Sequence, residues 1–550
     1  MRRVDAARHG VPAVPLRRGR PREPAHQSRT RSDEPDAGIQ GVRGPGGGGR
    51  GGEPVTRRVV IVGNGMAGAR LAEELRRRER DPLRLEIVVL GAEPRAAYNR
   101  ILLSNVLAGG LTVRDTRLRP DDWWVRNHID VRVGVRVTAI DTDARTVRGD
   151  DGTEVSYDEV VLATGSTAFV PPVDGMRADD GRVVAFRTAA DCDRIAAAAE
   201  PGCRAVVLGG GLLGLEAARG LLLRGADVTV VHPRAVPMER QLDDDGGRVL
   251  TRVLTGLGVR TMLGRRAVAM RDTPSGRLLD LDDGAALPVD LVVLTAGIRP
   301  ATDLARAAGI AVDHGIVVDD ALHTSAAHVW AIGECAQHRG QVYGLVQPGW
   351  EQADVVADRI TGADPCAEYH GTPPVTRLKA HDIDLASMGD VSAQLHDPDR
   401  DVLVLADPSR ARYAKLVVAG DRIVGAVLLG CPDAVGTITQ LFDAQLPVPG
   451  DRMALLTGRG STPADTVTPA GMPGNAVICR CNSVTKSNLT TAWRAGARSV
   501  SALATATRAT TGCGGCSAAV DGICEWLRTT DPQTEHHEGT TQSARKEGAA

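Results

Sequence analysis

Four cysteines near the C-terminus are spaced for metal chemistry. Cys479 and Cys481 are separated by one residue, and Cys513 and Cys516 are separated by two. Two close pairs of thiolates can converge on one point, which suits either zinc or an iron–sulfur cluster. The one-residue spacing is tighter than is usual for zinc, and the neighbouring glycines leave a small loop that can offer N–H groups to sulfur. The pattern therefore favours an iron–sulfur cluster, with structural zinc as the alternative.

Two glycine-rich segments have the spacing of dinucleotide-binding loops. The glycines are Gly63, Gly65 and Gly68 in the first segment and Gly209, Gly211 and Gly214 in the second. Each segment follows a short apolar stretch and opens a helix-like one, so that a pyrophosphate could approach the backbone at the helix N-terminus. Glu93 follows the next apolar stretch and could accept ribose hydroxyls. Two such sites in one chain predict two cofactors, one resident and one exchanging.

The second glycine-rich site lacks the usual ribose acid. Its second strand ends at His232, and Arg234 follows two residues later. These side chains could bind a 2′-phosphate, which favours NADPH slightly over NADH; the alternative is that both are solvent-facing loop residues. Two interpretations stay open for Glu216, in the first turn of the helix: contact with the nicotinamide, or a favourable interaction with the helix dipole.

The elements that position these residues alternate between strand and helix. Strands are expected at 59–62, 85–90, 160–163, 205–208, 227–231, 291–295 and 329–332, with helices that end near Arg78 and Arg224. This order predicts an α/β protein with two Rossmann-like dinucleotide folds, the second inserted in the first. After residue 369 the pattern becomes alternating and β-rich, which predicts a separate α+β domain, and the cysteines fall in a small C-terminal helical unit.

Composition excludes several classes of function. The 550 residues carry a formal net charge of −2, so no strong basic field points to nucleic acid or a membrane surface. The 66 basic residues include only four lysines, an arginine excess that we interpret as mainly compositional. The chain has neither an apolar run long enough to span a membrane nor the apolar region of a secretory signal. The unpaired spacing of the remaining cysteines predicts a reducing, cytoplasmic location.

The ordered motifs resemble those of the FAD/NAD(P)-dependent pyridine nucleotide-disulfide oxidoreductases. The resemblance rests on both glycine loops, on Ala163-Thr164-Gly165, on Gly297-Ile298-Arg299-Pro300 and on the run 329–334. It implies that the first fold binds FAD and the second binds NAD(P)H, and that Glu334 contacts the ribityl chain of the flavin. The implied FAD contacts are Gly63, Gly65, Gly68, Glu93, Arg100, Thr164, Gly165, Gly333 and Glu334, and the implied NAD(P) contacts are Gly209, Gly211, Gly214, Glu216, His232, Arg234 and Gly297.

Local sequences narrow the resemblance further. The segments around 93–104, 238–243 and 333–346 resemble the large subunit of assimilatory NAD(P)H nitrite reductases and the electron-transfer subunit of assimilatory nitrate reductases. The C-terminal cysteine unit resembles bacterioferritin-associated-ferredoxin-like [2Fe–2S] domains, which implies that Cys479, Cys481, Cys513 and Cys516 are the cluster ligands.

The chain departs from that family's disulfide chemistry. Residues 95–115 contain no cysteine, and Ser104 lies near the place where the redox thiol is expected. A hydroxyl cannot replace a thiolate at neutral pH, so thiol-based reduction is not expected. Cys335 and Cys524 are interpreted as buried structural residues.

These observations divide the chain into predicted parts. They are a disordered tail at 1–54, an FAD-binding domain at 55–166 and 296–365, an NAD(P)-binding domain at 167–295, an interface domain at 366–456, a linker at 457–475, a [2Fe–2S] domain at 476–528 and a disordered tail at 529–550. The interface domain could form a homodimer or bind a partner. Whether the first tail belongs to the mature protein stays open.

The expected activity is electron transfer from NAD(P)H through FAD and the [2Fe–2S] cluster to an outside acceptor. The resemblance points to a separate molybdenum nitrate reductase catalytic subunit as partner. Because only 34 residues follow Cys516, without a sirohaem region, we expect no nitrite reduction by this chain alone. The alternatives are another soluble acceptor (a rubredoxin, a ferredoxin or a nitrite reductase partner) and a redox or iron sensor that does not turn over. No residue is assigned as a catalytic acid or base.

Overall fold

The computed structural model describes residues 56–458 and 468–531, except residues 82, 178–179, 379 and 512–513. The predicted N-terminal tail lies outside these residues, as do 459–467 of the predicted linker and 532–550 of the predicted C-terminal tail. Among the helices of the described part, none is long and apolar enough to cross a bilayer.

The first sheet has five parallel strands in the order β19-β7-β1-β2-β3. The strands are β1 (Arg57–Val62), β2 (Leu85–Gly91), β3 (Ile129–Val133), β7 (Glu159–Leu162) and β19 (Val329–Ala331), and the helices and short strands around them are α1 (Met66–Arg78), α2 (Leu103–Leu107), α3 (Asp121–Arg126), β4 (Val137–Asp141), β5 (Thr146–Gly149), β6 (Glu154–Ser156), α7 (Asp303–Ala307), β18 (Ile316–Val318), β20 (Ala336–His338), β21 (Gln341–Val342) and α8 (Val346–Thr361). Val59, Val60 and Ile61 of β1 are completely buried, as expected for the central strand of a covered parallel sheet.

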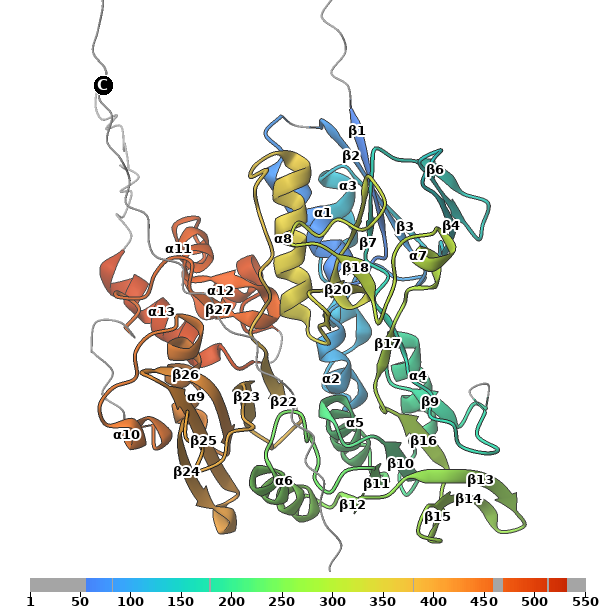
Figure 1. The fold of residues 1–550 in the computed structure, drawn as a ribbon, viewed down its shortest axis with the longest axis vertical. Coiled ribbons are helices and arrows are strands. Elements are labelled where there is room, and N and C mark those ends of the chain that lie inside the picture. The colour runs from blue at the N-terminus through green and yellow to red at the C-terminus, as the bar shows by residue number, and fades with distance from the viewer. Residues whose placement is uncertain are drawn as a thin grey trace, which may run out of the picture. The chain divides into compact units, whose positions relative to one another are not determined.

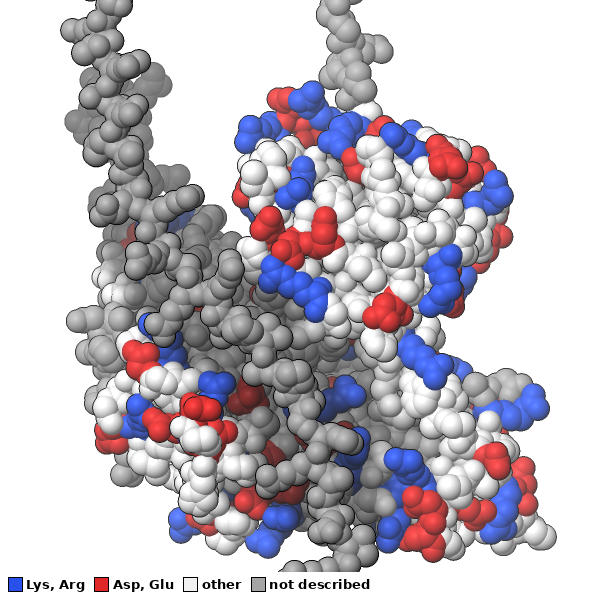
Figure 2. Space-filling view, in the orientation of Figure 1, with Lys and Arg blue, Asp and Glu red and all other residues white. Residues whose placement is uncertain are grey.

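Helices α1 and α8 lie side by side next to this sheet (Figure 1). Met66, Ala69, Ala72 and Leu75 recur at three-residue intervals on α1 and are all buried, which gives the helix its apolar face. Arginines along the other side pair with acids of α8: Arg78 Nε, for example, lies 3.0 Å from Asp358 Oδ1. Figure 2 shows acidic and basic side chains interspersed over the visible face, in keeping with the net charge of −2.

The second sheet is also parallel, in the order β12-β11-β10-β16-β9. Its fold consists of β9 (Val183–Ala185), α4 (Ala189–Ala198), β10 (Arg204–Leu208), α5 (Leu212–Leu223), β11 (Asp227–His232), α6 (Asp244–Gly256), β12 (Arg260–Leu263), β16 (Leu291–Leu294) and the antiparallel strands β13 (Ala267–Thr273), β14 (Gly276–Leu281) and β15 (Ala286–Pro288). All of these elements come from the chain between β7 and β19, which confirms the predicted insertion.

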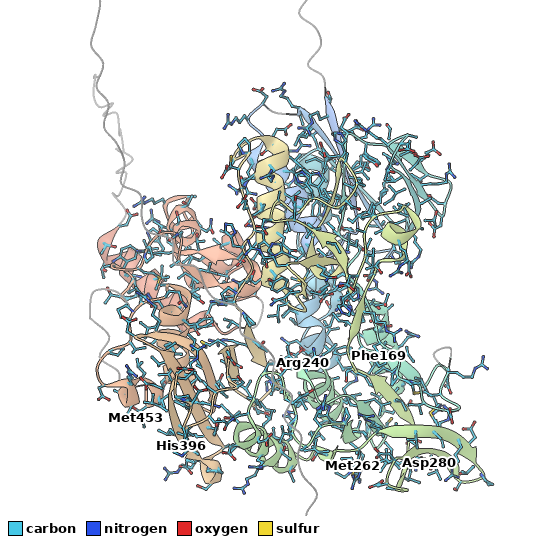
Figure 3. The ribbon with its side chains drawn as sticks, in the orientation of Figure 1. Phe169, Arg240, Met262, Asp280, His396 and Met453 are labelled. Atoms are coloured by element: carbon cyan, nitrogen blue, oxygen red, sulfur yellow. The ribbon has the colours of Figure 1, made fainter. Side chains whose placement is uncertain are left out.

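Two short strands carry the chain between the two folds. They are β8 (Ser166–Ala168) and β17 (Ile298–Pro300), and they pair antiparallel. Phe169, labelled in Figure 3, continues this pairing, because its N–H donates to the Gly297 carbonyl oxygen at 2.9 Å. The Arg299 guanidinium lies over the Phe169 ring, 4.7 Å from its centroid.

The C-terminal third forms an antiparallel sheet followed by a small helical unit. The sheet has the order β22-β23-β26-β25-β24. Its elements are β22 (Val375–Leu378), β23 (Leu385–Gly389), β24 (Asp401–Asp407), β25 (Arg412–Ala419), β26 (Arg422–Leu429), α9 (Pro432–Asp443) and α10 (Arg452–Leu456), and the cysteine-bearing unit has β27 (Val477–Cys479), the short 3-10 helix η5 (Arg480–Asn482), β28 (Val484–Thr485), α11 (Lys486–Arg494), α12 (Val500–Thr507) and α13 (Ser517–Thr530). The unit has its own apolar core, built around Leu489, Trp493, Leu503, Val520 and Ile523.

A buried ion pair fastens the antiparallel sheet to the second fold. Lys415 of β25 is 2% exposed, and its Nζ donates to Asp243 Oδ2 at 2.8 Å. Tyr413 donates its hydroxyl to the same oxygen at 2.6 Å, and Asp243 also caps α6. Burial tends to raise the pKa of Asp243, but the hydrogen bonds from Lys415 and Tyr413 outweigh it and hold the pKa below the ordinary value.

Removing the charge of Asp243 is expected to destabilise this junction. The substitution Asp243→Asn leaves the Lys415 ammonium buried without its counter-ion, so the free energy of unfolding should fall by about 3 kcal/mol. Asp244→Asn is the matched control, because the neighbouring Asp244 side chain is 76% exposed. Denaturant unfolding at neutral pH measures both variants. Folding lowers the pKa of Asp243, so the contribution of Asp243 to the free energy of unfolding of the wild type should be lost as the pH falls through that lowered pKa. Equal stability of the two variants would contradict the assignment.

Candidate functional site

The residues predicted to bind FAD follow the carboxyl ends of β1, β2, β7 and β19. Gly63 adopts a φ of +121°, and a Cβ on it would overlap the Ala163 carbonyl oxygen. A Cβ on Gly68 would overlap the carbonyl oxygen of Gly63. These two glycines are therefore required for the turn and for close packing of helix on strand, whereas a Cβ on Gly65 would meet no described atom within 4 Å.

The open space at Gly65 lies at the start of α1. No side chain caps this helix, so the N–H groups of its first turn can serve an anion. Next to it, both polar atoms of the Asn64 amide are buried and have no hydrogen-bond partner among the described residues. A backbone cradle, uncapped donors and an unsatisfied amide fit the pyrophosphate of a dinucleotide.

Two carboxylates lie at the predicted FAD site, and each is held by an arginine. Glu334 accepts a hydrogen bond from the Ser166 hydroxyl at 2.8 Å and pairs with the Arg187 guanidinium. Glu93 accepts from the Tyr98 hydroxyl at 2.8 Å and pairs with Arg100. Arg187 comes from the inserted fold and was not predicted from the sequence.

Tyr98 connects the predicted ribose acid to the second fold. Its hydroxyl oxygen accepts the N–H of Ala189, the first residue of α4, at 3.0 Å. Burial raises the pKa of Tyr98 to about 12, so the hydroxyl stays protonated and can donate to Glu93. Thr164 donates its hydroxyl to the Ala301 carbonyl oxygen at 2.8 Å, and Gly165 follows with a φ of +68°. The roles of these residues toward FAD stay predictions.

The second glycine loop repeats the first in geometry. Gly209 has a φ of +124°, and a Cβ on Gly214 would overlap the Gly209 carbonyl oxygen. A Cβ on Gly211 would again meet no described atom within 4 Å, and α5 begins there without a side-chain cap. Gly297 follows the adjacent strand β16 with a φ of +118° and the same open surroundings. The predicted NAD(P) glycines are thus brought to one edge of the second sheet.

The polar residues predicted at the second site differ in their surroundings. His232 is buried; its Nδ1 accepts the Gly210 N–H at 3.0 Å and its Nε2 lies 3.0 Å from Glu239 Oε2. Both ring nitrogens of His232 therefore have partners, so His232 positions the glycine loop. Arg234 is exposed and stays the candidate for binding a 2′-phosphate. Glu239, which sequence reasoning missed, brings an acid to the end of β11. Glu216 is buried within the first turns of α5.

The cysteine site is described at two of its four predicted ligands. Cys479 and Cys516 are buried, and hydrogen bonding between their thiols lowers the pKa of Cys479 to about 7. The Thr510 N–H donates to Cys516 Sγ at 3.2 Å, and the Asn482 amide donates to Cys479 Sγ at 3.7 Å. Two converging thiols with N–H donors aimed at sulfur suit a thiolate-ligated cluster.

Cys335 and Cys524, which the sequence predicts to be buried structural residues, are both buried. Cys513 and the side chain of Cys481 lie outside the described residues. Cys524 belongs to the apolar core of the small unit. Cys335 is completely buried, and burial raises its pKa, which does not suit a redox thiolate. Ser104 is buried in α2.

Comparison with known families identifies three parts of the chain. Residues 57–355 match the pyridine nucleotide-disulphide oxidoreductase family. The chain belongs to this family. Residues 374–443 match the rubredoxin NAD+ reductase C-terminal domain, and residues 477–526 match the BFD-like [2Fe-2S] binding domain. These matches give the chain the cofactor set of a flavoprotein oxidoreductase, namely FAD, NAD(P)H and a [2Fe–2S] cluster.

The chain is similar to proteins named as nitrite or nitrate reductases and to a ferredoxin–NAD(+) reductase component. The chain is 37% identical to a nitrite reductase [NAD(P)H] of Bacillus subtilis (85% of this chain, 57% of the relative) and 36% identical to the assimilatory nitrate reductase electron transfer subunit of the same organism (86% and 60%). It thus spans less than two thirds of these relatives. It is 33% identical to the ferredoxin–NAD(+) reductase component of the anthranilate 1,2-dioxygenase system of Burkholderia cepacia, over 70% of this chain and 94% of that one.

Solved structures share the fold. The covalent putidaredoxin reductase–putidaredoxin complex matches with a TM-score of 0.66 and 27% identity, over 75% of this chain and 98% of that one. A ferredoxin reductase from Rhodopseudomonas palustris matches with a TM-score of 0.64 and 26% identity, over 72% and 96%.

The two open glycines allow the cofactor sites to be tested separately. Gly65→Ala adds a methyl group where only a pyrophosphate would approach, so we expect an unchanged fold and an FAD affinity lower by about tenfold or more. Gly211→Ala should instead keep FAD and weaken NAD(P)H binding by a similar factor. Flavin retention during dialysis and the KM for NAD(P)H measure the two effects; each variant is the control for the other, and equal effects on both cofactors would contradict the assignment.

The cluster ligands can be tested against a buried cysteine of the same unit. Cys516→Ser should abolish the cluster, because serine is a poor ligand for iron in this setting. Cys524→Ser should retain it, since Cys524 lies in the apolar core. Iron and acid-labile sulfide analysis of the purified proteins should give about two of each per chain for the wild type. Stoichiometric zinc in place of iron, or cluster loss in Cys524→Ser alone, would overturn the assignment.

Proposed function

We propose that this protein draws electrons from NAD(P)H and delivers them one at a time to a separate protein, an assimilatory nitrate reductase catalytic subunit that contains molybdenum. The proposal rests on one observation: a single chain contains two dinucleotide-binding folds and a [2Fe–2S] domain. The cysteine loop of that domain contacts α8 of the first fold.

The chemistry explains why these parts belong together. When bound, a flavin accepts two electrons from a nicotinamide as a hydride and can release them singly to a cluster. The residues of the chain then have to bind the two cofactors and align the nicotinamide with the flavin. The uncapped starts of α1 and α5 would bind the two pyrophosphates, and the β8–β17 pairing connects one fold to the other. No side chain has to supply a general acid or base.

The relatives favour a nitrate-assimilating acceptor. The relative named as an assimilatory nitrate reductase electron transfer subunit aligns over 86% of this chain. That name describes a protein that serves a separate catalytic subunit, and we extend this arrangement to the present chain.

A second candidate is reduction of a small electron carrier such as a rubredoxin or ferredoxin. The match of residues 374–443 to the rubredoxin NAD+ reductase C-terminal domain supports it, as does a rubredoxin-NAD(+) reductase of Alcanivorax borkumensis that is 33% identical over 58% of this chain. Homodimer formation through the antiparallel sheet also stays a prediction.

Coupled turnover distinguishes these candidates. We expect the holo-protein with NADH or NADPH to support nitrate-dependent coenzyme oxidation only when the molybdenum catalytic subunit is added. Cys516→Ser should lose this coupling through loss of the cluster, whereas Cys524→Ser should keep it. The measurement is anaerobic coenzyme oxidation at 340 nm with nitrite quantified as product.

Three outcomes would contradict the proposal. Reduction of nitrite to ammonium by this chain alone would show that no separate catalytic subunit is needed to accept the electrons. Fast reduction of rubredoxin or ferredoxin without coupling to nitrate reductase would favour the second candidate. Absence of turnover with every acceptor, including ferricyanide, would favour a sensor.

A further inference from the structure

Arg480 lies between the first two predicted cluster ligands and joins their loop to two other parts of the chain. Its guanidinium donates to Gln347 Oε1 at 2.6 Å and forms an ion pair with Asp443, the last residue of α9. The Arg480 side chain is only 19% exposed. Charge-assisted hydrogen bonds of this kind are short and directional, so they can fix a loop in one position.

The Gln347 amide is itself held in orientation. Its Nε2 donates to Glu351 Oε1 at 2.8 Å, one helical turn further along α8, which leaves Oε1 directed to Arg480. Thr372 donates its hydroxyl to the other oxygen of Glu351. The acceptor for Arg480 is thus part of a network rather than a mobile surface side chain.

The turn that carries Gln347 also contacts the predicted flavin site. A Cβ on Gly349 would lie 3.2 Å from the Gly333 Cα, and Gln352 Oε1 accepts the Gly333 N–H at 2.7 Å. Gly333 directly precedes Glu334, the predicted ribityl contact. At 1.5 Å of rise per residue, Gln347 and Gly349 belong to the same helical turn. Figure 1 shows β27, which ends at Cys479, near this end of α8.

The second cysteine-bearing segment has an arginine against it as well. A Cβ on Gly515, next to Cys516, would overlap the Arg377 guanidinium of β22. Gly515 therefore allows a cation to approach the backbone of the loop. A cluster with four thiolates is anionic, so it would attract the Arg377 guanidinium that lies against this loop.

We propose that Arg480 docks the cluster loop onto the N-terminal turn of α8 and so holds the cluster at the flavin site. The inference rests on the proposed function and specifies the route within it. For each NAD(P)H oxidised, one proton is released and two electrons leave through the cluster in single steps, each reducing an external one-electron acceptor before the next follows. Arg480 takes no part in the chemistry; it is a positioning residue.

The test compares Arg480→Gln with Arg494→Gln in the holo-protein. Arg494 is the matched control, because it lies in the same small domain with a side chain that is 69% exposed and pairs with Asp531. After anaerobic mixing with NAD(P)H, we expect flavin bleaching at the wild-type rate in both variants. Cluster reduction should slow by about tenfold or more in Arg480→Gln only, the effect of losing a charge-assisted hydrogen bond.

A structural readout accompanies the kinetic one. Hydrogen–deuterium exchange of peptides that cover 345–352 should become faster in Arg480→Gln and stay unchanged in Arg494→Gln. Equal EPR signals after dithionite reduction should show that both variants keep the cluster. If Arg480→Gln loses it, Gln347→Ala with Asp443→Asn replaces that variant, since these changes remove the same contacts without altering the cysteine loop.

The outcomes separate the docking inference from the proposed function. Wild-type rates of cluster reduction and wild-type exchange in Arg480→Gln, or in the replacement variant, would overturn the docking role and leave the proposed function intact. A wild-type cluster that NAD(P)H never reduces would overturn the proposed function itself.

Discussion

The first turn of α8 is the contact on which the arrangement of this protein depends. It is packed so closely against the loop after β19 that Gly349 faces the Gly333 backbone without a side chain between them. The same turn receives Arg480 from the cysteine-bearing unit through Gln347. One helical turn therefore touches both the predicted flavin contacts and the predicted cluster loop. If either contact were lost, the two redox centres would be held together less firmly, and the cluster would spend less time at the flavin site.

Much of this architecture follows from local sequence. The glycine spacing predicts the loops because Gly63 and Gly68 leave no room for a Cβ, and the apolar stretches predict the strands to within about two residues. The residues that sequence reasoning missed share a different property. Arg187, Gln347 and Asp443 act through partners 147, 133 and 37 positions away. An arginine-rich chain offers no local signal for which guanidinium will meet which carboxylate, so these contacts become visible only in the folded structure.

At the second cofactor site, the local sequence likewise does not reveal the contacts of one residue, His232. From its place at the end of β11, His232 is a reasonable contact for a 2′-phosphate. Its two ring nitrogens are instead directed to the Gly210 N–H and to Glu239, so it shapes the glycine loop. We therefore expect coenzyme preference to depend on exposed Arg234, which would favour a phosphate, and on Glu239, which would favour a free hydroxyl. The cysteine site is the opposite case, because the spacing alone predicts convergence and the thiols of Cys479 and Cys516 do converge.

An experimental structure of the protein loaded with both FAD and the [2Fe–2S] cluster would test the docking of the cluster loop on α8 most directly. We predict that the first turn of α8 lies between the two cofactors, with Arg480 bound to Gln347 and Asp443 and the flavin beside Gly333. A structure in which the cluster lies away from α8 and Arg480 faces solvent would contradict it.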